Sequence, residues 1–72
     1  MKALFTIYKK DITGTIQPIE AAEASQESGI QWVKDYITNN NLKTLKHKNY
    51  MTIKQLETAP FQFAYDILVT NK

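Results

Sequence analysis

The clearest pattern along the chain is an alternation of apolar residues with smaller or polar ones from Phe61 to Thr70. Side chains of a strand alternate between its two faces, so five large apolar side chains would share one face here. They are Phe61, Phe63, Tyr65, Ile67 and Val69. This pattern is typical of a half-buried antiparallel strand whose other face is directed to solvent.

A second apolar segment, Lys2–Lys9, carries large side chains at both odd and even positions. A strand here would be apolar on both faces, which predicts an interior position in the sheet. The residues Asp11–Gly14 supply turn chemistry, because glycine adopts positive φ without strain. We therefore expect the chain to return as a second strand over Thr15–Ala22 and so complete a hairpin.

The returning strand is interrupted at Pro18. Ile16 and Ile19 cannot face the same way in a regular strand, and proline cannot donate a hydrogen bond to the sheet. A β-bulge or a free edge at Pro18 would accommodate both features. The alternative is a helix that begins near Pro18, because Glu20–Ala24 has high helix propensity. We prefer the strand, but the sequence leaves residues 18–24 open between the two.

Apolar residues recur at helical spacing after Ser25, which is a suitable N-cap for a helix that ends near Asn39. The apolar face of this helix would consist of Gly29, Ile30, Trp32, Val33, Tyr36 and Ile37. Glycine is unfavourable in a helix interior, and a close approach of the helix to the sheet would explain Gly29. We expect this face to pack against the strand Phe61–Thr70.

The segment between the helix and the last strand is the hardest to interpret. Leu42–Asn49 fits either a loop or a single helical turn, since its two leucines are three residues apart. Tyr50–Glu57 alternates well enough to predict a strand, and Thr58–Pro60 has the composition of a turn.

The predicted order of elements is β-β-α-β-β. A chain of 72 residues has room for one hydrophobic core, so we expect residues 1–72 to form a single α+β domain. The expected architecture is a four-stranded, mainly antiparallel sheet with one helix packed on one face. The open face would carry Leu4, Tyr8 and Leu68, which is more apolar than usual for a monomer. Strand order and self-association into a homodimer are left open.

Charge is unevenly distributed along the chain, although the formal net charge is only +2. Four acids and one lysine lie between Glu20 and Asp35, whereas Lys43–Lys54 holds four lysines and no acid. Every basic residue except the single histidine is lysine, and the absence of arginine argues against bidentate reading of base edges. The candidate partner-binding residues are Lys43, Lys46, His47, Lys48, Tyr50, Lys54 and, as an exposed aromatic anchor, Trp32. Packing in the core is the favoured alternative for Trp32.

The sequence contains no recognisable constellation for catalysis, metal binding or cofactor binding. There is no cysteine, a single histidine at His47, and only two glycines, which leaves no glycine-rich phosphate loop. Glu20, Glu23 and Glu27 are close in sequence, but such a group is typical of a solvated helix face. We therefore expect no catalytic residues, no metal and no cofactor, and do not expect an enzyme.

Two functional hypotheses follow. The first is a non-enzymatic protein-binding module, an inhibitor or adaptor of a larger phage, mobile-element or host machine, whose partner presents an acidic surface. The alternative is a non-specific binder of nucleic-acid backbones through Lys43–Lys54, since lysine neutralises phosphate without reading sequence. Cysteine is absent, no segment has the character of a secretory signal, and no apolar run is long enough to cross a bilayer. These features favour a cytoplasmic protein that does not associate with membranes.

Overall fold

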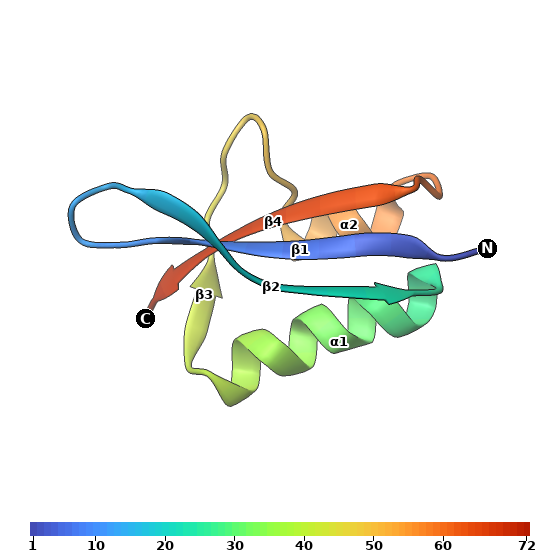
Figure 1. The fold of residues 1–72 in the computed structure, drawn as a ribbon, viewed down its shortest axis with the longest axis horizontal. Helices are drawn as coiled ribbons and strands as arrows, with labels where there is room; N and C mark the ends of the chain where they lie inside the picture. The colour runs from blue at the N-terminus through green and yellow to red at the C-terminus, as the bar shows by residue number, and fades with distance from the viewer.

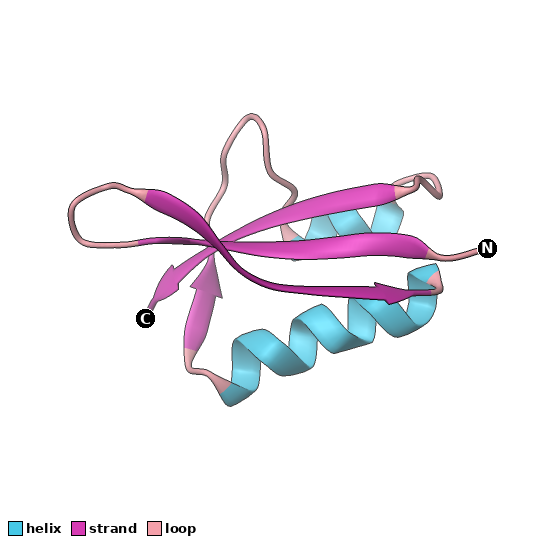
Figure 2. Ribbon diagram, viewed as in Figure 1, coloured by secondary structure: helices cyan, strands magenta, loops and turns pink.

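A computed structural model of the chain describes residues 1–72 and contains one mixed sheet and two helices (Figure 1, Figure 2). The strands are β1 (Ala3–Lys10), β2 (Ile16–Ala24), β3 (Leu42–Thr44) and β4 (Ala64–Asn71), and the helices are α1 (Gln26–Asn39) and α2 (Ile53–Thr58). The sheet has four strands in the order β2-β1-β4-β3. The predicted α+β class is confirmed. Neither helix has the length and apolar character needed to cross a membrane.

The N-terminal hairpin forms as the sequence predicts. Asp11 Oδ1 accepts hydrogen bonds from the Thr13 and Thr15 amides, at 2.9 and 3.0 Å, and orders the turn. Gly14 has φ of +89°, the conformation for which glycine is suited. The register of β2 shifts opposite Ile7 and Tyr8, where Ile19 is bulged out, so the interruption at Pro18 is a β-bulge on an edge strand. The alternative helix over residues 18–24 is wrong.

The centre of the sheet is a parallel pair of strands, β1 and β4, which lie side by side in Figure 1. The other two pairings, of β1 with β2 and of β3 with β4, are antiparallel. The sheet is therefore mainly antiparallel, as expected, but the last strand does not have the purely antiparallel neighbours that its alternation predicted. It enters the sheet between β1 and β3, and its outer neighbour is only three residues long.

The hydrophobic core lies on one face of this central pair. The parallel register aligns Phe5 with Tyr65 and Ile7 with Ile67, and the Phe5 and Tyr65 rings stack with centroids 5.1 Å apart. The buried cluster comprises Ala3, Phe5, Ile7, Val33, Leu42, Leu56, Tyr65, Ile67 and Val69. Both helices contribute to it, so α1 and α2 pack against the same face of the sheet.

The face of β4 expected from its alternation is correct from Tyr65 onward and wrong at its beginning. Phe61 and Phe63 precede the strand and are 36% and 72% exposed, so they lie outside the core. The turn before β4 is held by hydrogen bonds and not by packing of these two rings in the core. The Tyr65 hydroxyl donates to the Pro60 carbonyl at 2.7 Å and accepts from the Gln62 amide at 2.6 Å. A buried tyrosine usually finds such partners, and here they fix the entry of the chain into β4.

Helix α1 begins and ends close to the predicted positions. The Ser25 hydroxyl accepts from the Ser28 amide, and Asn41 adopts a left-handed φ of 53° just beyond the end. Val33 is fully buried, and Ile30 and Ile37 pack against the core cluster, as the predicted apolar face requires. Gly29 lies directly over the Phe5 ring, so the close approach of helix and sheet is confirmed.

The third strand and the segment after it differ from prediction. The strand is Leu42–Thr44, in a stretch interpreted as loop or helical turn, and Ile53–Thr58 is a helix where Tyr50–Glu57 had predicted a strand. Helix α2 begins with a capping box, in which the Thr52 hydroxyl accepts from the Gln55 amide and the Gln55 side chain accepts from the Thr52 amide. The sheet therefore has two helices on one face instead of one.

Replacing Gly29 by alanine tests the contact between α1 and the sheet. The added Cβ would overlap the Phe5 ring, and overpacking of this kind costs about 1–3 kcal/mol. The gain in helix propensity returns at most about 1 kcal/mol, so we expect a lower midpoint of denaturant unfolding. Ser28→Ala, at the neighbouring exposed position, is the control and should be neutral or stabilising. A Gly29→Ala protein as stable as the wild type would contradict this packing.

Candidate functional site

The loop that connects β3 to α2 is hydrogen-bonded to the neighbouring strand β4 near its beginning and near its end. The Leu45 amide donates to the Leu68 carbonyl and the Met51 amide donates to the Asp66 carbonyl, both at 2.8 Å. These two hydrogen bonds tie both ends of the loop to β4. The residues between them project from the edge of the sheet, as Figure 1 shows.

The projecting part of the loop is ordered by its own hydrogen bonds. The Tyr50 amide donates to the His47 carbonyl at 3.1 Å, which closes a four-residue turn. The Asn49 amide donates to His47 Nδ1 at 3.3 Å, so the neutral ring carries its proton on Nε2. The His47 and Tyr50 rings meet edge to face with centroids 5.2 Å apart. The turn therefore has a defined shape despite its exposure.

Tyr50 also anchors the loop to the open face of the sheet. Its ring meets that of Tyr8 on β1 edge to face, with centroids 5.1 Å apart. Leu68 is the register partner of Tyr8 and is only 1% exposed, although no helix covers this face. The open face therefore exposes less apolar surface than the sequence suggested, because the loop shields part of it. Leu4 on the same face remains 42% exposed.

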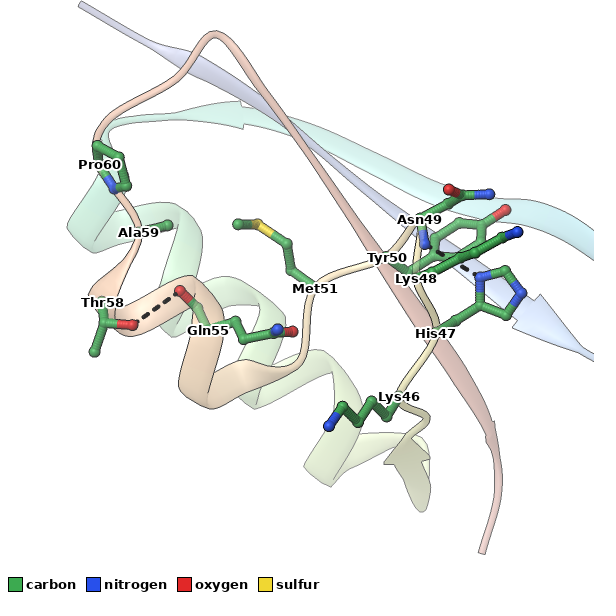
Figure 3. Close-up of a pocket in the computed structure, with 10 residues that line it drawn as sticks. All are labelled: Lys46, His47, Lys48, Asn49, Tyr50, Met51, Gln55, Thr58, Ala59 and Pro60. Atoms are coloured by element: carbon green, nitrogen blue, oxygen red, sulfur yellow. Dashed lines mark hydrogen bonds between the residues drawn. The ribbon is translucent and has the colours of Figure 1, made fainter.

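An open hollow of about 670 Å³ lies between this loop and the C-terminal half of α2 (Figure 3). It is lined by Lys46, His47, Lys48, Asn49, Tyr50, Met51, Gln55, Thr58, Ala59 and Pro60. No carboxylate is among these residues, and its charged lining groups are the two lysines, so its local charge is positive. The volume falls in the range of about 300–1,000 Å³ that is usual for ligand sites.

The structure brings together four of the seven residues that the sequence proposed for partner binding, namely Lys46, His47, Lys48 and Tyr50. Lys43 on β3 and Lys54 on α2 are exposed but do not line the hollow. Trp32 is elsewhere, on α1, where it packs against the core cluster and against Tyr36 with ring centroids 5.8 Å apart. Its placement supports the interpretation of Trp32 as part of the core.

The sequence interpretation missed one wall of the hollow. Gln55, Thr58, Ala59 and Pro60 come from α2 and its C-terminal end, which had been assigned to a strand and a turn. The signal that could have found this wall is the spacing of Thr52 and Gln55, since threonine followed three residues later by glutamine is the sequence signature of a capping box.

The open face of the sheet also holds a half-buried carboxylate. Asp66 of β4 lies opposite Thr6 of β1, and burial raises the pKa of its side chain. The negative charge of Asp66 is the main cause that raises the pKa of Tyr8, followed by burial and by Tyr50. No ion pair or side-chain hydrogen bond involves Asp66; the single ion pair in the structure joins Lys34 of α1 to Glu57 of α2.

The hollow presents both polar and apolar groups. Its polar groups are two ammonium groups, two side-chain amides, two hydroxyls and the His47 imidazole, and no carboxylate is among its lining residues. No group of three or more histidine, aspartate or glutamate side chains is arranged to hold a metal ion. The comparisons with known proteins add no assignment, because no family model, curated protein or solved structure matches the chain significantly.

Asp66→Asn tests the cost of burying this carboxylate. The folded-state pKa is raised, so ionised Asp66 opposes folding above that pKa, and the cost disappears below its ordinary value of 3.8. The variant should therefore have a higher unfolding midpoint than wild type at pH 7, and the difference should vanish near pH 3. Hydrogen bonds from Thr13 lower the pKa of Asp11, so Asp11→Asn should shift the midpoint the other way at pH 7. Equal or lower stability of Asp66→Asn at pH 7 would contradict this assignment.

Proposed function

We propose that this chain is a non-enzymatic protein-binding module, an inhibitor or adaptor of a larger assembly, that binds an acidic surface of its partner with the β3–α2 loop. The observation that carries the proposal is the hollow, because it joins Lys46 and Lys48 to apolar surface without a single carboxylate. Complementary charges of this kind steer a partner to the surface and set its orientation.

A protein partner fits the loop better than a nucleic acid does. A nucleic-acid binder would need an aromatic ring of the loop, such as Tyr50, to stack on bases. The Tyr50 ring already contacts the rings of Tyr8 and His47. The lining of the hollow includes Met51, Ala59 and Pro60, whose apolar side chains offer nothing to a phosphate group. Contacts between lysines and phosphates remain the alternative, and they predict binding that is independent of sequence and very sensitive to salt.

The lysines of the hollow provide the test. Lys46→Gln combined with Lys48→Gln should slow association with the partner by roughly tenfold at low salt, with a smaller effect on dissociation. The partner is obtained by affinity capture on the immobilised chain from a lysate treated with nuclease, and the rates are measured by surface plasmon resonance. Lys2→Gln combined with Lys72→Gln is the matched control, since it removes the same charge at two exposed positions outside the hollow.

The competing function predicts a different outcome. A nucleic-acid binder would lose its captured material on nuclease treatment and would shift random-sequence DNA or RNA at physiological salt. Its log K would fall with log salt by about 0.9 for each phosphate neutralised on duplex, or about 0.7 on single strands. Such a shift with sub-micromolar affinity, abolished by the Lys46 and Lys48 changes, would overturn the protein-binding proposal.

A further inference from the structure

The hollow has a basic end and an apolar end. Figure 3 shows Lys46, His47 and Lys48 on the loop, on the side of the hollow away from Pro60, and Met51 pointing from the loop toward Ala59 at the C-terminal end of α2. Lys48 and Tyr50 belong to the same loop and also line the hollow. The two ends belong to one continuous depression, so a single ligand can contact both.

We infer that the hollow binds a short acidic peptide segment of the partner and takes one apolar side chain of that segment against Met51, Ala59 and Pro60. This inference rests on the proposed function and specifies its mode of recognition. Carboxylates on either side of the apolar residue would contact Lys46 and Lys48. The segment would be a local stretch of the partner, not an extended flat surface.

The charges around the hollow support an acidic segment. None of its lining residues is an acid, and Glu57, the acid of α2, is paired with Lys34 on the side of the helix that faces α1. The positive charge of Lys46 and Lys48 is therefore not neutralised from within the hollow. Lys46 and Lys48 are exposed, so the carboxylates of an acidic peptide could contact their ammonium groups and still keep part of their hydration.

The apolar end supports an anchoring side chain. Met51 is half-buried, and methionine is unbranched and adapts its shape to irregular apolar partners. Both ends of the loop are tied to β4, and α2 is capped at Thr52, so the walls exist before a ligand arrives. A preformed site needs less ordering on binding, which leaves more of the contact energy for affinity. A bare phosphate or polyanion would leave this end unfilled.

Synthetic peptides separate the two contributions. The first peptide has one leucine between two pairs of glutamates. A second peptide carries alanine in place of the leucine, and a third carries glutamine in place of every glutamate. We expect the leucine peptide to bind about tenfold more tightly than the alanine peptide, equivalent to about 1.4 kcal/mol, since part of the leucine side chain leaves water. The glutamine peptide should bind at least tenfold more weakly. Fluorescence anisotropy measures all three affinities.

A variant that fills the hollow provides the second arm. Thr58→Trp places an indole in the hollow and should remove the advantage of leucine over alanine, whereas Thr38→Trp makes the same change at an exposed position of α1 outside the hollow. Circular dichroism melts establish that both variants fold. Lys46→Gln with Lys48→Gln should weaken the leucine and alanine peptides by the same factor and so preserve their ratio.

Three outcomes would overturn the inference. Equal affinity for the leucine and alanine peptides, with both weakened by the lysine changes, would remove the anchor and leave the charged surface of the proposed function intact. Absence of binding by every peptide, with the captured partner still sensitive to the lysine changes, would show that the partner uses a broad surface. A change in molecular mass with the lysine changes, measured by light scattering, would assign the hollow to a second copy of this chain.

Discussion

The parallel pairing of β1 with β4 is the interaction on which the rest of the structure depends. It aligns Phe5 with Tyr65 and Ile7 with Ile67, and these side chains make the floor on which both helices pack. The Phe5 ring, which stacks on Tyr65, lies so close beneath α1 that a side chain at position 29 would overlap it, and the helix has glycine there. β2 and β3 are the two edge strands, so after the hairpin the chain crosses the sheet as α1 and enters β4 only after β3 and α2.

The candidate site is a consequence of this path of the chain. After α1 the chain runs along the outer edge of β4 as β3, and it must then reach the start of β4 from the other end. Its hydrogen bonds to β4 stop after Leu45 and resume at Met51. The chain then crosses the core face of the sheet as α2. The hollow is the space between the helix and the part of the loop that lies between these hydrogen bonds. The hollow is basic because this part of the loop contains Lys46 and Lys48, whereas Glu57, the acid of α2, is paired with Lys34.

The two faces of the sheet differ in what covers them. The helix face is apolar and buries no unsatisfied side-chain polar group, so it supplies the stability of the fold. The open face combines Leu68, Tyr8 and Asp66, and the loop shields part of it through the contact between Tyr8 and Tyr50. Lys46 and Lys48 lie outside the core cluster, so changes to these lysines of the hollow leave the core contacts untouched.

Local physics is enough to place the turn of the hairpin and helix α1, because turn residues and caps act between neighbours in the chain. It favours a strand interrupted at Pro18, but it left residues 18–24 open between strand and helix and did not choose between a bulge and a free edge. The sequence alone also identified the loop lysines as a cluster without acids, which is a property of composition. It did not determine that Phe61 and Phe63 stay outside the core, that β4 lies between β1 and β3, or that α2 replaces a strand. Those outcomes are decided by which partner buries each apolar face, and a short segment such as Tyr50–Glu57 is compatible with either a strand or a capped helix until the sheet beside it is in place. One wall of the hollow belongs to α2, so the site as a whole exists only in the tertiary structure.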